Sequence, residues 1–279
     1  MKPLSLISLF LILLLASCES VSEPQLDTRP LVVEGWIETG ANPIVTVAHA
    51  LDLKEGSVNI GDYVEKWCRV SIYDGDKRYL LTGKINNDYP TSFIYTSSQL
   101  RGQRGHSYRL LVESESDTVE AVSTIMPAAS ISSLKAEKVE GVEGAYTLKL
   151  FLNNIDPDGM YKVFVRVDGR SKIFHGSLMG TFTGRDYDDT KGHTVSLALN
   201  ASDNNDNFTH YFHAGEKVYV KIYSLDRPVY DFWKSYDNSV LMSGNLFFTF
   251  ADNCPTNIDG GLGYWAAYGS SLSIINIPR

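Results

Sequence analysis

Short segments with strand-type composition follow one another through the first half of the chain. Residues 31–37 form an apolar run rich in β-branched and aromatic side chains, and a turn sequence, Gly-Ala-Asn-Pro, separates it from a second run at 44–48. Further runs are separated by turn residues such as Gly, Asn and Asp, and they cover 68–73, 78–81, 92–95, 108–112 and 118–125. This spacing predicts an antiparallel β-sandwich over residues 31–128.

The second half repeats the same kind of pattern. A proline followed by two alanines, at 127–129, suits a boundary between domains. New alternating runs then cover 131–136, 146–152, 160–167, 194–199 and 217–223. We therefore expect a mainly β protein with two tandem antiparallel sandwich modules, immunoglobulin/fibronectin-like or transthyretin-like. The second, C-terminal β-rich domain covers residues 129–279.

One segment departs from the strand pattern. Residues 227–236 place apolar or aromatic side chains at 229, 230, 232, 233 and 236, which is the spacing of one helix face, and Pro228 suits a first helical turn. The pattern predicts a short helix in the second module. Such a helix could close the end of a sandwich or present a functional group of aromatic side chains.

The first eighteen residues have the order of an export signal. Lys2 precedes an apolar run at 4–15 that is too short to span a bilayer, and small residues lead into Cys18. Leu-Ala-Ser-Cys resembles a bacterial lipobox, which implies a signal peptide at 1–17 and lipidation of Cys18. The alternative is an ordinary signal peptide followed by a chance cysteine.

Residues 18–30 have no apolar periodicity and read as a flexible tether. The acidic residues just after Cys18 resemble the signal that carries Bacteroidota lipoproteins to the outer face of the outer membrane. A lipid-anchored outer-membrane protein facing the outside is the expectation, and an anchor facing the periplasm is the alternative.

The net charge and the cysteine content bear on which partners the chain can bind and on whether it forms a disulfide. The formal net charge is −8, and it becomes −9 without Lys2 and the rest of the signal peptide. A net-acidic chain without a long Lys/Arg run is a poor candidate for binding nucleic acid. Besides Cys18, the chain has Cys68 and Cys254, which could form a disulfide outside the cytoplasm or remain as two free thiols.

The sequence lacks two common catalytic and metal-binding motifs. It has no His-Glu-x-x-His motif and no Gly-x-Ser-x-Gly motif, and the histidines at 210 and 213 would face opposite sides of a strand. Acidic residues at 186–189 and 203–206 suit solvated loops better than a Ca²⁺ site. The glycine-rich 259–263 segment suits a bend better than an anion cradle. We expect no catalytic residue, metal or cofactor.

Three segments resemble one family. Residues 244–248 together with 257–268 resemble its closing signature, 31–37 its first strand, and 230–233 its aromatic helix. The family is a group of Bacteroidota outer-membrane lipoproteins catalogued as domain of unknown function 4249, and the resemblance covers nearly all of the mature chain. Members are often encoded beside TonB-dependent transporters, which implies help in nutrient capture.

These observations favour a non-enzymatic surface lipoprotein that binds a glycan or peptide, or a TonB-dependent transporter. The alternatives are a surface hydrolase acting on glycan or peptide and a structural or adhesive module of the envelope. The candidate ligand contacts are aromatic residues that could equally serve in packing: Tyr187, Tyr211, Tyr230, Trp233 and Trp265.

Overall fold

The computed structural model describes residues 29–50, 60–197, 210–243 and 254–279. Within these ranges the protein is mainly β, with one α-helix and two 3₁₀ helices. The first half contains β1 (Leu31–Glu38), β2 (Ile44–His49), η1 (Ile60–Tyr63), β3 (Arg69–Asp74), β4 (Lys77–Leu80), β5 (Thr82–Ile85), β6 (Phe93–Thr96), β7 (Ser107–Glu113) and β8 (Thr118–Thr124). The second half contains β9 (Ser130–Lys138), β10 (Ala145–Asn153), β11 (Met160–Val167), β12 (His175–Thr183), η2 (Gly184–Asp186), β13 (His193–Val195), β14 (Phe212–His213), β15 (Lys217–Leu225), α2 (Arg227–Ser243) and β16 (Leu262–Asn276).

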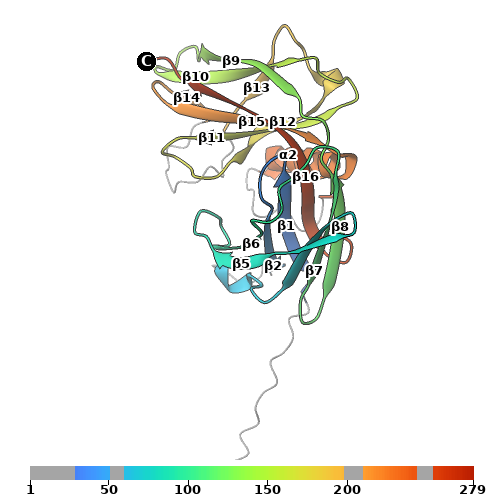
Figure 1. Ribbon diagram of the computed structural model, residues 1–279. Helices are drawn as coiled ribbons and strands as arrows, with labels where there is room; N and C mark the ends of the chain where they lie inside the picture. Colours follow the sequence, from blue (N-terminus) through green and yellow to red (C-terminus); the bar gives the residue numbers. More distant parts are fainter. Residues whose placement is uncertain (1–28, 51–59, 198–209, 244–253) are drawn as a thin grey trace, which may run out of the picture.

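One long sheet runs through both halves of the molecule (Figure 1). Its strand order is β12-β11-β15-β16-β1-β2-β6-β5. A four-stranded sheet, β4-β3-β7-β8, packs against the N-terminal part, and a second one, made of β13, β10, β14 and β9, packs against the C-terminal part. The prediction of a mainly β, sandwich-like fold is confirmed.

Each sandwich has its own apolar core, formed by alternating side chains. On β1, Leu31, Val33 and Ile37 are buried in the N-terminal core, because successive side chains of a strand point to opposite faces. The C-terminal core has the same origin, with Val163 and Val165 of β11 facing it.

The last strand belongs to both sandwiches. Residues 262–268 of β16 pair in parallel with β1, and residues 269–276 pair antiparallel with β15. Trp265 and Ala267 lie in the N-terminal core, whereas Ile275 packs against the C-terminal one. Strand β16 therefore contributes to the cores of both units that the sequence analysis expects, 31–128 and 129–279.

Gly263 shows how closely β16 approaches β1. Its φ is +97°, and a Cβ built there would lie 2.0 Å from the Val33 carbonyl oxygen. Only a residue without a side chain fits so close to the neighbouring strand. The glycine-rich segment therefore bends the chain and allows β16 to pair closely with β1.

Helix α2 covers part of the long sheet on the face opposite the two cores, where the sandwiches join (Figure 1). Val229, Phe232 and Trp233 are buried there, on the face that the sequence periodicity indicated. No helix within the described residues is long and apolar enough to span a membrane.

Candidate functional site

The side chains under α2 form a continuous aromatic cluster, called the α2 cluster below. Its rings come from five elements and are Phe164 of β11, Tyr223 of β15, Tyr264 and Tyr268 of β16, Trp36 of β1, and Phe232 and Trp233 of α2. Four strands of the long sheet therefore supply its floor, and the helix supplies its cover.

Ring geometry in the cluster is specific. Tyr223 and Tyr268 stack with centroids 4.2 Å apart, and Trp233 meets Phe164 edge-on at 5.2 Å. The indole Nε1 of Trp233 donates a hydrogen bond to the Tyr268 hydroxyl at 3.0 Å. Aromatic pairs in these arrangements add about 0.5–1.5 kcal/mol each beyond the area they bury.

A buried ion pair holds the helix in place. Lys162 Nζ lies 2.6 Å from Asp237 Oδ1 and 3.1 Å from the Ser177 carbonyl oxygen. The other Asp237 oxygen accepts a hydrogen bond from the backbone N–H of Thr181 at 3.0 Å. Burial lowers the pKa of Lys162, and the neighbouring Asp237 opposes that shift.

Glu34 is the most unusual group at the edge of the cluster. It lies on β1 beside Tyr264, whose hydroxyl donates to Glu34 Oε1 at 2.9 Å. The residue is exposed to solvent, yet enough protein surrounds its carboxyl that desolvation raises the pKa above its usual value, against the effect of the Tyr264 hydrogen bond. Glu34 is therefore an exposed residue whose carboxyl has a reduced tendency to ionise.

Two tyrosines from other elements have pKa values that the Glu34 charge raises. Burial raises the pKa of Tyr236 on α2, and the Glu34 charge adds to the shift. The pKa of Tyr89, in the β5–β6 connection, is raised by burial, by Asp88, and then by Glu34. Tyr89 also packs against Trp36 with centroids 6.0 Å apart. We call Glu34, Trp36, Tyr89, Tyr236 and Tyr264 the Glu34 site.

The second carboxylate on this face of β1 is already paired. Glu38 Oε1 and Oε2 lie 2.7 and 2.9 Å from Lys221 Nζ on β15, in a partly buried contact. The Glu38 carboxylate is therefore engaged with Lys221, whereas the Glu34 carboxyl accepts a hydrogen bond from Tyr264.

The Glu34 site has the groups needed to bind polar molecules. A carboxyl accepts hydrogen bonds from hydroxyl or ammonium groups, and the surrounding rings offer apolar faces for stacking. In the described part of the chain, no group of three or more His, Cys, Asp or Glu side chains could hold a metal ion.

The structure brings two of the five predicted contact residues to the α2 cluster. Trp233 is central to it, and Tyr230 packs at its edge. Trp265 points to the opposite face, where it is fully buried and its Nε1 donates to the Tyr108 carbonyl oxygen at 2.9 Å. Trp265 therefore packs in the N-terminal core, away from the other two.

The remaining predicted aromatic contacts lie apart. Tyr187 packs against the C-terminal core, and its hydroxyl accepts a hydrogen bond from the Leu152 N–H at 2.8 Å. Tyr211 is half-buried next to β14. The acidic loop at 186–189 uses its oxygens internally, since Asp186 binds Thr183 and Asp188 binds Thr190.

Cys68 and Cys254 are free thiols in the structure. Cys68 packs against the N-terminal core and Cys254 against the α2 cluster. The disulfide that the sequence left open is not formed, because the two cysteines border different clusters. Burial raises the pKa of the Cys68 thiol to about 12.

Several predicted features lie outside the described residues. They are the signal peptide at 1–17, Cys18, most of the 18–30 tether, the acidic segment at 203–206 and the 244–248 motif.

Sequence reasoning missed Glu34. The signal was present, because a lone carboxylate interrupts the otherwise apolar 31–37 run. Alternation assigns such a residue to the side facing away from the core. It does not reveal that a helix far along the chain packs near that side.

A family model matches most of the chain. The family model described as "Domain of unknown function (DUF4249)" matches residues 19–272. No curated protein matches the chain. Among solved structures, the crystal structure of chicken CNTN1 FN1-FN3 domains is similar at 9% sequence identity, with a TM-score of 0.26. The match covers 71% of this chain. It covers 59% of the chicken chain, which is less than two thirds of its length.

Proposed function

Since the chain belongs to the DUF4249 family, whose domain has no assigned function, we propose its role from its own residues. It is a lipid-anchored lipoprotein on the outer face of the outer membrane. There it captures a nutrient without chemically changing it and passes it to a TonB-dependent transporter. The Leu-Ala-Ser-Cys sequence and the acidic residues after Cys18 support the location.

The observation that carries the binding role is the exposed residue Glu34, whose carboxyl accepts a hydrogen bond from Tyr264 at the edge of the α2 cluster. Carbohydrates present hydroxyl groups to such a carboxyl and apolar ring faces to aromatic side chains. A glycan is therefore the ligand class that this site fits best. A peptide amine is the second candidate, because it would pair with the ionised form.

The proposal has a direct binding test. The chain from residue 19 onward is screened against glycans and peptides, and positive ligands are measured by calorimetry. Glu34→Gln should weaken binding at least tenfold. The control Glu137→Gln removes an exposed carboxyl from β9, in a different sheet, and should leave affinity unchanged. Equal affinity for both variants would contradict the assigned site.

The transporter is tested separately. The native protein is purified from detergent-solubilised outer membrane, and its companions are identified by mass spectrometry. A stoichiometric TonB-dependent barrel is the expected result. Recovery of the protein alone would contradict the transporter link, and steady release of products from a bound glycan or peptide would favour the hydrolase alternative.

A further inference from the structure

The segment Lys66-Trp67-Cys68-Arg69 carries the most exposed of the large apolar side chains described. Trp67 is 91% exposed, while Trp265 and Trp233 are buried and Trp36 is half-buried. Lys66 and Arg69 on either side are also exposed. The segment therefore offers an indole ring flanked by two exposed cationic side chains, of which Arg69 also lies 3.6 Å from Glu113 Oε1.

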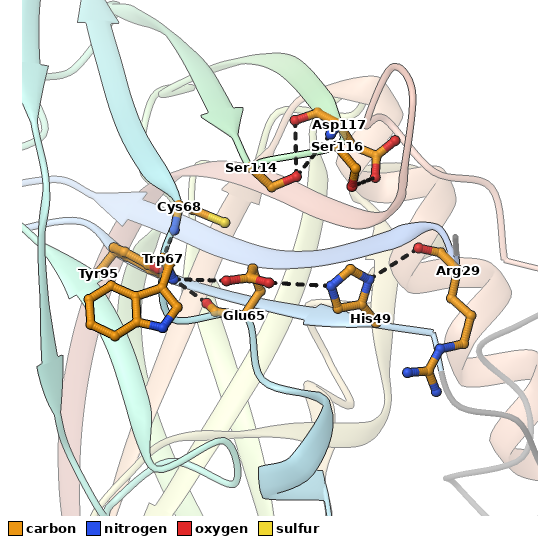
Figure 2. A network of polar contacts seen from close by, with 9 residues as sticks. All are labelled: Arg29, His49, Glu65, Trp67, Cys68, Tyr95, Ser114, Ser116 and Asp117. Atoms are coloured by element: carbon orange, nitrogen blue, oxygen red, sulfur yellow. Dashed lines mark hydrogen bonds and ion pairs between the residues drawn. The ribbon is translucent and has the colours of Figure 1, made fainter. Parts of the chain in front are cut away.

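The backbone around Trp67 is held in place by hydrogen bonds (Figure 2). The Trp67 N–H donates to Glu65 Oε1 at 2.8 Å, and the Cys68 N–H donates to the Tyr95 hydroxyl at 3.0 Å. The Tyr95 hydroxyl in turn donates to the Glu65 carbonyl oxygen at 3.1 Å. The indole is thus presented from a fixed backbone, which reduces the entropy lost when it meets a partner.

The same contacts connect Trp67 to the point where the described chain begins. Glu65 Oε2 lies 3.4 Å from His49 Nε2, and His49 Nδ1 lies 3.1 Å from the Arg29 carbonyl oxygen (Figure 2). His49 pairs with Leu31, the first residue of β1. The far end of that strand, Glu38, contacts Lys221 of the C-terminal sandwich. Trp67 and Arg29 therefore share the end of the N-terminal sandwich that points away from the C-terminal one.

The distance to the proposed anchor is short. Eleven peptide steps separate Cys18 from Arg29, and a fully extended chain of that length spans at most about 40 Å. If Cys18 is lipidated, as the proposed function holds, this end of the protein stays within that distance of the bilayer.

We propose that Lys66-Trp67-Cys68-Arg69 is a membrane-contact site, with Trp67 seated among the headgroups of an anionic bilayer. Tryptophan is favoured at that depth because its ring is apolar while its N–H can still find a polar partner. Lysine and arginine close to the surface are attracted by anionic headgroups. This contact would orient the molecule so that the C-terminal sandwich points away from the membrane.

Contact between Trp67 and the bilayer can be measured by quenching of tryptophan fluorescence. The purified lipoprotein is placed in phosphatidylethanolamine–phosphatidylglycerol vesicles, with and without bromine on the acyl chains. Subtracting the emission of Trp67→Phe isolates the Trp67 signal. Brominated lipid should reduce this signal at least twofold, and Lys66→Gln/Arg69→Gln should weaken the quenching. An equal Trp67 signal in both kinds of vesicle would overturn the proposal.

A second arm separates this inference from the proposed function on which it rests. The mass of the native protein shows whether Cys18 is acylated. A chain beginning at residue 19, with six histidines in front, is then held on vesicles that contain nickel-chelating lipid. Quenching of Trp67 on these vesicles supports the contact even if Cys18 proves to be unmodified. Acylation of Cys18 without quenching in either arm refutes the contact and leaves the anchor intact.

Discussion

Lys162 Nζ and Asp237 Oδ1 lie 2.6 Å apart in a buried ion pair between strand β11 and helix α2. The two residues are 75 positions apart in the chain, and the sequence gives no sign of their pairing. Through this contact, the helix that covers the α2 cluster is fixed to the long sheet.

Removing one partner of this pair should strongly destabilise the protein. Asp237→Asn leaves the Lys162 cation buried without a counter-charge, which typically costs about 3–5 kcal/mol. Lys162→Met, which keeps the length of the side chain, should cost a similar amount by stranding Asp237. Chemical denaturation of each variant measures the change in the free energy of unfolding.

The double variant Lys162→Met/Asp237→Leu should be less destabilised than the sum of the two single changes, because it leaves no isolated charge. It still removes the acceptor of the Thr181 N–H. As a control, Asp158→Asn breaks an exposed pair with Arg185 and should leave the denaturation midpoint unchanged. Simple additivity of the two single effects would show that the charges do not act as a pair.

Glu34 should make the protein less stable as the pH rises. Its pKa is raised above the usual 4.5, so the folded state binds the proton more readily than the unfolded chain does. The free energy of unfolding then falls as the pH increases from about 4.5 through the higher pKa of the folded state.

Glu34→Gln should remove this component and raise stability at pH 7 relative to the native sequence. Denaturation midpoints between pH 4 and pH 7 provide the measurement. Glu137→Gln, on β9, should follow the native curve. If Glu34→Gln shows the same pH dependence as the native protein, its carboxyl is not desolvated.

The sequence predicted the positions of the strands better than it predicted which strands pair with one another. The pattern of β-branched, aromatic and alternating side chains located β1, β7, β10 and β11. It gave no means of finding that Leu262 pairs with Val32, since that contact joins opposite ends of the chain.

The candidate site was likewise predictable only where its residues lie close together in the sequence. Tyr230 and Trp233 were selected together because they lie close together on one helix, and the fold keeps them close. Trp265 was selected for its residue type alone, and the strand period places it on the opposite face of the sheet from Tyr264. Glu34 gains its hydrogen-bond donor from Tyr264, 230 residues later, which local patterns do not encode.

The N-terminal sandwich should not fold without the end of the chain. Ile258, Trp265 and Ala267 belong to its core, so residues 29–128 alone lack the strand that pairs with β1. We expect this fragment to show little dispersion in its amide NMR spectrum. Joining residues 254–269 to it through a glycine–serine linker should restore dispersion. A well-dispersed spectrum from residues 29–128 alone would show that β16 is dispensable to this sandwich.

Gly263→Ala tests how closely β16 must approach β1. The backbone at Gly263 has φ +97°, and the new methyl group would meet the Val33 carbonyl oxygen at 2.0 Å. Gly40→Ala is the matched control, because Gly40 also has a positive φ, +76°, but no atom lies within 4 Å of its added Cβ. The control should lose only the conformational cost, about 1 kcal/mol. Gly263→Ala should lose at least twice as much, because β16 must also move away from β1 and open the pairing that shields Trp265. Equal losses in the two variants, measured by denaturant unfolding, would mean that β16 can shift without cost.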